Sequence, residues 1–240
     1  MVHKIITSVS ILLMGCLVQA QTVGEVFKKI TAGYSIAQPL QYKTDYKLFK
    51  DHKSTKVEEN YKGVFYKNAE NEVYIKINDT EIINTKKTNI KVSHSENAIV
   101  VSNPVANYFG EADFNKVFEL CKLNSFKDFK THWEIILEPK AYSGLTYSKI
   151  VLNVSKTYFI QKQIFYYNTG INFSKDYKGT DVNYPRLEVV YSDYSRKAIP
   201  ASVFNTQNYL TISGKNSIVL AQRFKKYEII DERIISNNIK

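Results

Sequence analysis

Short runs in which apolar and polar residues alternate dominate this chain after Pro39. For example, Val73, Ile75 and Ile77 alternate with Tyr74 and Lys76. Successive side chains of a β-strand point to opposite faces, so a period of two predicts a strand with one buried face. Segments rich in Asn, Asp, Ser and Thr separate the runs and have the composition of turns, which predicts an antiparallel meander. The other runs predicted to be strands are Leu40–Leu48, Val57–Lys67, Glu81–Thr85, Asn89–Ser93, Ala98–Val101, Thr131–Glu138, Tyr147–Val154, Tyr158–Tyr167, Arg186–Tyr194, Tyr209–Ser213 and Ile218–Ile230.

Two segments instead have apolar residues spaced three and four positions apart, which is the period of an α-helix. The first is Thr22–Gln38, with Thr22 as the predicted N-cap, and the second is Glu111–Leu123. The polar segment Asn168–Tyr184 is predicted to be a loop or a partly ordered hairpin. Because no low-complexity linker divides the chain, Gln21–Lys240 is predicted to be one α+β domain built on a single large antiparallel sheet.

The N-terminal segment Met1–Ala20 has the three parts of a secretory signal peptide. A basic start is followed by an apolar run from Ile5 to Val18 and by small residues before a cleavage site after Ala20. The apolar run is short for a membrane span and no stop-transfer segment follows it, so the mature chain is expected to be periplasmic, without a transmembrane span. A competing interpretation takes the residues before Cys16 as a lipobox, which would leave the protein lipid-anchored at Cys16.

The net charge of +10 at pH 7 does not by itself predict an anionic ligand. The lysines are spread along the chain, and arginine, the residue best suited to bidentate phosphate recognition, is scarce. The charge is therefore interpreted as solvated surface, and export argues against nucleic acid as a partner. Cys121 is the one thiol that remains after removal of the signal peptide, so no internal disulfide is expected, and its apolar neighbours predict a core position.

Motifs that carry catalysis or bind metals are absent from the sequence. His52, His94 and His132 stand alone, without the spacing of metal ligands, and no serine lies in a nucleophile elbow. The glycines do not cluster into a phosphate-binding loop. The chain is therefore predicted not to be an enzyme and to need no cofactor and no metal.

Aromatic residues are abundant, with 18 tyrosines and 13 phenylalanines. A large sheet twists and curls, so it has a concave face, and two helices cover only part of that face. The remainder must be filled by the protein's own side chains, by a partner or by an apolar ligand. An acyl chain suits such a face, because each buried methylene contributes about 0.8 kcal/mol and no polar motif is needed.

Several segments resemble the LolA-like family, the periplasmic lipoprotein-carrier superfamily, as it occurs in exported proteins of Bacteroidetes-type bacteria. Besides the N-terminal helix, they are Tyr61-Lys-Gly-Val-Phe-Tyr-Lys, Glu72-Val-Tyr-Ile-Lys-Ile-Asn-Asp-Thr-Glu-Ile-Ile, Trp133-Glu-Ile-Ile-Leu-Glu-Pro-Lys and Pro185-Arg-Leu-Glu-Val-Val-Tyr-Ser-Asp-Tyr. The resemblance implies an incomplete barrel of about eleven strands, partly plugged by helices, whose cavity takes acyl chains. It implies neither a cofactor nor covalent chemistry. The lysine-rich surface and Asn168–Tyr184 have no counterpart in the family pattern.

The resulting hypothesis is a periplasmic carrier or chaperone that binds a lipid or the acyl chain of a lipoprotein, with a further envelope protein as a second partner. The alternative is a scaffold component of an envelope or secretion assembly, with its cavity filled by its own side chains. A third interpretation, binding of an anionic polymer, requires lysines gathered on one face. The predicted cavity lining, some of which is expected to pack under the helices instead, is Val73, Ile75, Trp133, Ile135, Leu137, Ile150, Leu152, Leu187, Val189 and Tyr191.

Overall fold

The computed structural model describes residues 21–106, 114–176, 179–213 and 217–233. The predicted signal peptide, the alternative anchor at Cys16 and the first residues of the second predicted helix lie outside this part of the chain. No helix within it is long and apolar enough to cross a membrane.

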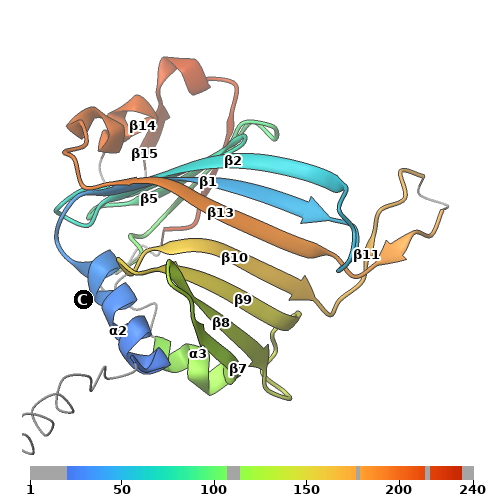
Figure 1. The fold of residues 1–240 in the computed structure, drawn as a ribbon. Helices are drawn as coiled ribbons and strands as arrows, with labels where there is room; N and C mark the ends of the chain where they lie inside the picture. Colours follow the sequence, from blue (N-terminus) through green and yellow to red (C-terminus); the bar gives the residue numbers. More distant parts are fainter. Residues whose placement is uncertain (1–20, 107–113, 177–178, 214–216, 234–240) are drawn as a thin grey trace, which may run out of the picture.

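One open sheet of 12 strands forms most of the molecule, as the alternating sequence predicted (Figure 1). Its order is β16-β6-β5-β4-β3-β2-β1-β13-β10-β9-β8-β7. The strands are β1 (Leu40–Phe49), β2 (Val57–Lys67), β3 (Val73–Ile77), β4 (Thr80–Asn84), β5 (Asn89–Ser93), β6 (Ala98–Ser102), β7 (Cys121–Asp128), β8 (His132–Pro139), β9 (Tyr147–Ser155), β10 (Ile160–Tyr167), β13 (Arg186–Ser195) and β16 (Glu228–Asp231). All neighbours are antiparallel except β16, which runs parallel to β6 and makes the sheet mixed.

The remaining elements are short. They are the helices α2 (Val23–Ser35) and α3 (Phe114–Leu120), the hairpins β11 (Ile171–Asn172) with β12 (Val182–Asn183) and β14 (Leu210–Ser213) with β15 (Ser217–Leu220), and the 3₁₀ turns η1 (Ala201–Phe204), η2 (Thr206–Asn208) and η3 (Gln222–Phe224).

Two predictions of secondary structure were wrong in detail. The predicted helix Glu111–Leu123 ends at Leu120, because Cys121–Asp128 pairs with β8 as an edge strand. The predicted strand Ile218–Ile230 is divided by η3 into β15 and β16.

The sheet curls around α2. Val73 on β3 and Leu137 on β8 belong to one core cluster with α2, although six strand positions separate their strands. In a flat sheet, that separation would place the two strands ~29 Å apart. The face toward α2 is therefore concave, and Figure 1 shows α2 and α3 at one end of the curl, with the β11–β12 hairpin projecting at the other.

The sequence of α2 specifies both its start and its buried side. The predicted N-cap Thr22 is confirmed: its hydroxyl accepts from the Glu25 amide, and the Glu25 carboxylate accepts from the Thr22 amide. Such a capping box contributes about 1 kcal/mol. The side chains Val26, Phe27, Ile30 and Tyr34 are buried against the concave face.

Two cations from the sheet bind the C-terminal end of α2, whose last turn contains no basic residue of its own. The Lys67 ammonium donates to the carbonyls of Tyr34 and Ile36, both at 2.7 Å, and the Arg196 guanidinium donates to the Gly33 carbonyl at 2.6 Å. Lys67 is only 2% exposed. Burial, together with the Arg196 charge, lowers the pKa of Lys67. The carbonyls that accept these hydrogen bonds and the negative end of the helix dipole compensate for this buried charge.

A second core lies on the opposite, convex face of the sheet. Apolar side chains of β4, β5 and β6 pack there against Tyr209, Leu210 and Phe224 of the C-terminal segment. At its edge, the Glu81 carboxylate accepts hydrogen bonds from the Tyr209 hydroxyl at 2.5 Å and the Tyr74 hydroxyl at 3.2 Å, and it contacts His94 Nε2 at 2.8 Å. Burial favours protonation of Glu81, but the hydrogen bonds from Tyr209 and His94 outweigh it and hold the pKa of Glu81 below its usual value.

We expect Lys67→Met to reduce the free energy of unfolding by about 2–4 kcal/mol, because the Tyr34 and Ile36 carbonyls lose the buried ammonium that donates to both while the side-chain volume is kept. Lys28→Met, the same substitution on the exposed side of α2, is the control and should change stability by no more than about 0.5 kcal/mol. Urea unfolding of both variants makes the comparison. Equal midpoints would show that Lys67 does not hold the helix end.

Glu81 also predicts a pH dependence. A carboxyl with a lowered folded-state pKa stabilises the fold above its unfolded pKa of about 4.3, and this contribution disappears as the pH falls through the folded value. We expect Glu81→Gln to lower stability at neutral pH by about 1–3 kcal/mol and to flatten the acid limb of the stability profile. The control is Glu96→Gln, an exposed carboxyl in the turn after β5. Identical acid profiles for the two variants would contradict this role.

Candidate functional site

All the residues predicted to line an apolar cavity lie on the concave face. The register of the strands shows this directly: Val189 pairs with Gln163, which pairs with Leu152, which pairs with Ile135. The next row toward the β11–β12 end joins Leu187, Phe165, Ile150 and Leu137 in the same way. The remaining predicted lining residues, Val73, Ile75, Trp133 and Tyr191, belong to the α2 core cluster or pack against it.

Burial divides the predicted lining into two groups. Most of it is sealed in the core, with Ile135 at 0% and Val189 at 3% exposure, and the sealed side chains are Val73, Trp133, Ile135, Leu137, Leu152 and Val189. The half-buried members are Ile75, Ile150, Leu187 and Tyr191. The half of the concave face next to α2 is thus filled by the protein's own side chains, and a ligand has direct access only to the half-buried group.

The end of the concave face away from α2 carries half-buried apolar side chains from four neighbouring strands. Leu48 on β1 pairs with Leu187, Leu187 with Phe165, and Phe165 with Ile150, which makes a continuous row across the sheet. Tyr46 and Tyr191 lie in the adjoining positions of the same face. We call this group the open patch; it comprises Tyr46, Leu48, Ile150, Phe165, Leu187 and Tyr191.

Tyr46, Leu48 and Phe165 belong to this patch but were not among the residues predicted from the sequence to line the cavity. Tyr46 and Leu48 continue the alternation that contains the buried residues Tyr42 and Thr44, so the sequence could predict which face of the sheet they lie on. It could not predict that they lie opposite Val189 and Leu187, because this depends on which strand pairs with β1.

Tyrosines form the boundary between the sealed core and the open patch. The Tyr191 hydroxyl donates to Gln163 Oε1 at 2.6 Å, so both polar groups are satisfied on an otherwise apolar face. Behind it, the Tyr34 and Tyr194 hydroxyls lie 2.7 Å apart, and Tyr194 donates to the Ile160 carbonyl. Burial raises the pKa of Tyr34, Tyr42, Tyr191 and Tyr194. The boundary stays uncharged at neutral pH.

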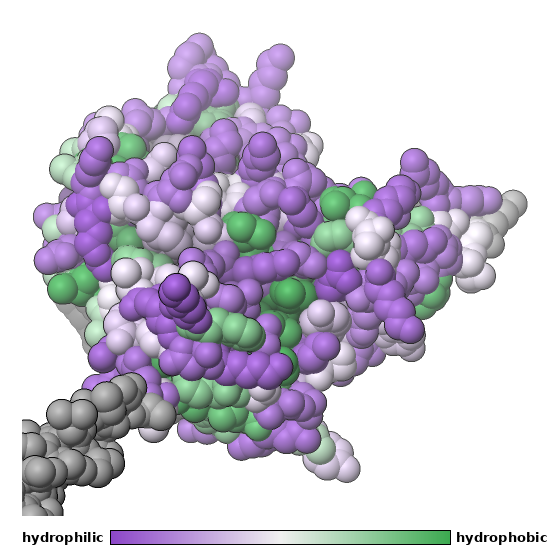
Figure 2. All heavy atoms as spheres, in the orientation of Figure 1, coloured by the Kyte–Doolittle hydropathy of each residue, from purple (hydrophilic) through white to green (hydrophobic). Residues whose placement is uncertain are grey.

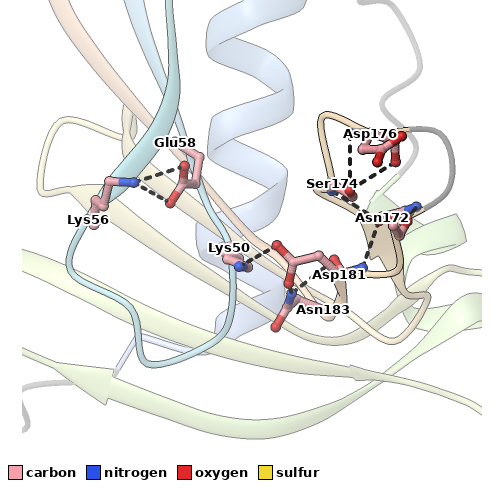
Figure 3. Close-up of polar contacts among 9 residues, drawn as sticks. Lys50, Lys56, Glu58, Asn172, Ser174, Asp176, Asp181 and Asn183 are labelled. Atoms are coloured by element: carbon pink, nitrogen blue, oxygen red, sulfur yellow. Dashed lines mark hydrogen bonds and ion pairs between the residues drawn. The ribbon is translucent and has the colours of Figure 1, made fainter.

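The β11–β12 hairpin is fixed beside the far end of the open patch by polar contacts (Figure 3). Lys50, which follows β1, contacts Asp181 at 2.6 Å, and the Asn183 amide donates to the same carboxylate at 2.9 Å. The Lys50 ammonium, with help from Asn183, holds the pKa of Asp181 below its usual range. Val182 and Tyr184 are 59% and 55% exposed, so the hairpin presents apolar side chains next to the patch.

The histidines, the cysteine and the carboxylates of the described residues do not assemble into a metal site. No three His, Cys, Asp or Glu side chains in this part of the chain could hold a metal ion. His52 contacts the Tyr167 carbonyl, and His94 contacts Glu81 and Tyr227. Cys121 is buried, which raises the pKa of its thiol and agrees with the predicted core position. On the side shown in Figure 2, apolar residues form small patches separated by hydrophilic ones.

Comparison with known proteins finds neighbours among the solved structures. No family model and no curated protein matches the chain. An uncharacterised conserved protein from Thermus thermophilus has a TM-score of 0.48 at 13% identity, covering 88% of this chain and 99% of its own. A LolA superfamily protein from Nitrosomonas europaea has a TM-score of 0.33 at 13% identity, covering 78% of this chain and 99% of its own.

A third neighbour is a domain from Vibrio parahaemolyticus assigned to outer membrane lipoprotein sorting, with a TM-score of 0.35 at 11% identity, covering 76% of this chain and 96% of its own. A LolA superfamily protein is thus among the structural neighbours. At these TM-scores the likeness is one of layout, so a function has to be inferred from this chain's own residues.

The tyrosine boundary predicts sensitivity to alkali. Phenols whose pKa is raised by folding stabilise the fold fully below their unfolded pKa of about 10, and that stability is lost as the pH rises above it. We expect Tyr42→Phe, which keeps the packing and removes one such phenol, to make the alkaline loss of stability smaller. Tyr142→Phe, at a fully exposed ring, should leave it unchanged. Urea unfolding at a series of alkaline pH values tests this; equal slopes for the two variants would contradict it.

Proposed function

We propose that this protein binds the acyl chain of a lipid or lipoprotein on the open patch and acts as a periplasmic carrier or chaperone. The observation that supports it is the row of Leu48, Leu187, Phe165 and Ile150, which are apolar, half-buried and in register on a concave face. The row crosses four adjacent strands, or about 14 Å, which suits an extended hydrocarbon chain. Ten methylenes buried there would supply on the order of 8 kcal/mol before the cost of association.

In this proposal the two halves of the concave face have different roles. The sealed half next to α2 gives the sheet its curvature and stability. The open patch receives the acyl chain. Val189 and Gln163, which lie in the adjoining row of the same face, would contact the bound chain from below. The chemistry is binding alone, without catalysis, cofactor or metal. The partners would be a lipid or acylated lipoprotein and a further envelope protein, and nucleic acid would not be one of them.

A scaffold role in an envelope or secretion assembly is the second candidate. It is favoured by the burial of Trp133, Ile135, Leu137 and Leu152, which fill much of the concave face from within. The two candidates differ in whether the open patch takes up an apolar ligand.

Binding of a fluorescent fatty acid distinguishes them. We expect saturable uptake by the wild type and an affinity at least about tenfold lower for Leu187→Glu, because a carboxylate on the patch must be desolvated by the ligand. Val219→Glu, an exposed position on the separate β14–β15 hairpin, is the matched control and should bind normally. Circular dichroism and urea unfolding would confirm that both variants fold. No uptake, or equal loss in both variants, would favour the scaffold.

Native mass spectrometry of protein purified from its own envelope fraction tests the proposed export and cargo together. We expect a chain that begins at Gln21 and carries co-purifying acyl species. A lipidated Cys16 would show that the protein is anchored in a membrane, and the proposal of soluble export would be wrong. The fatty-acid binding experiment would then still decide whether the open patch takes up an apolar ligand.

A further inference from the structure

A depression of about 530 Å³ lies on the convex face of the sheet, on the opposite side from the open patch. Alternation along β1 places it there: Tyr42 and Thr44 are buried toward the α2 side, so Lys43 and Asp45 point the other way. The volume lies within the range of small-ligand sites. Its lining comprises Lys43, Thr44, Asp45, Lys62, Gly63, Val64, Lys76, Asn78 and Ser192.

Three lysines from three adjacent strands surround one small apolar side chain in this depression. Lys43 on β1 pairs with Val64 on β2, and Val64 pairs with Lys76 on β3. Lys62 precedes Val64 by two residues on the same face of β2. Lys43 and Lys76 are two strand spacings apart, or about 10 Å, so their long side chains can reach one group placed above Val64.

These ammonium groups are only weakly engaged within the protein. Lys62 makes no ion pair among the described residues. Lys43 pairs with Asp193, but both side chains are more than 60% exposed, at 64% and 61%. Lys76 lies 3.8 Å from the Glu81 carboxylate, which already accepts from Tyr209 and Tyr74 and contacts His94. Exposed pairs of this kind contribute little, so the lysines are available to a ligand.

The backbone around the depression is irregular. The register of β1 against β13 shifts between Gln41 and Lys43, and Asp193 beside it has a φ of +56°. Gly63 also contributes to the lining, and a Cβ there would point to the opposite, concave face, where it would lie 2.4 Å from the Thr44 hydroxyl oxygen. Such bulges re-aim side chains at the surface of a sheet. Asn78 and Ser192 add an amide and a hydroxyl that can donate to the same ligand.

We propose that this depression binds a phosphate-bearing ligand, whose oxyanion is held by Lys43, Lys62 and Lys76. Three ammonium groups that can reach one point suit a multiply charged oxyanion, and the hydroxyl and amide donors suit its remaining oxygens. Asp45 is the opposing carboxylate in the lining, and it is occupied by Asn60 at 2.6 Å and Lys47 at 3.2 Å. The oxyanion can belong to a soluble phosphate compound or to a lipid head group. This site does not depend on acyl binding at the open patch.

The test uses inorganic pyrophosphate as the soluble probe and phosphatidylglycerol-containing vesicles as the head-group probe, with pure phosphatidylcholine vesicles for comparison. Lys62→Gln should weaken binding about threefold to fivefold, and Asp45→Asn should strengthen it, because each changes one charge beside the oxyanion. Lys91→Gln removes the same charge from β5, outside the lining, and should have no effect.

Calorimetric titration of pyrophosphate and co-sedimentation with vesicles give the readouts. Pyrophosphate binding with this pattern of variants supports a soluble phosphate ligand. Binding to anionic vesicles alone, with the same pattern, supports a lipid head group. Absence of binding to both probes would overturn the proposal, as would an equal loss in Lys62→Gln and Lys91→Gln, which would indicate nonspecific attraction to a basic surface.

Discussion

The packing of α2 inside the curled sheet is the interaction on which the rest of the structure depends. Its buried side joins β1–β3 to β8 and β9 in one core, although these strands are far apart in the sheet. Lys67 and Arg196 then hold its C-terminal carbonyls from the sheet side. Apolar burial supplies the affinity of the helix for the sheet, and these charge-assisted hydrogen bonds fix where it ends. The extent of α2 therefore decides which part of the concave face is sealed and which part stays open.

The two faces of the sheet present different chemistry to solvent. The concave face carries the open patch, where Leu48, Phe165 and Leu187 offer hydrocarbon surface with few polar groups. The convex face carries the depression lined by Lys43, Lys62 and Lys76, and farther along it the C-terminal segment covers β4–β6. Because strand residues alternate between faces, one stretch of β1 contributes to both surfaces. An apolar chain and a charged group could thus be recognised independently by the same sheet.

Local patterns were enough to predict most of the strands and the helix α2. The strands Val57–Lys67, Val73–Ile77 and Asn89–Ser93 have the bounds that the alternation predicted, and all the predicted lining residues share one face. Features that depend on pairing between distant strands were not predictable. The open patch forms because β1 pairs with β13, and the lysine depression forms because of the register of β1, β2 and β3. The three lysines are far apart in the sequence, and only the strand register shows that they are neighbours in the sheet. In Cys121–Asp128 an edge strand replaced the end of a predicted helix, because pairing with β8 outweighed a helical spacing that was only locally favourable.

Photo-crosslinking with a diazirine-bearing fatty acid, followed by peptide mass spectrometry, tests the acyl-binding proposal most directly, because it reports where a hydrocarbon chain lies. We expect labels in the peptides that contain Leu48, Ile150, Phe165 and Leu187, and we expect unlabelled fatty acid to compete with this labelling. Labels confined to exposed apolar residues elsewhere, such as Val219 on the β14–β15 hairpin, or the absence of competable labelling, would contradict it.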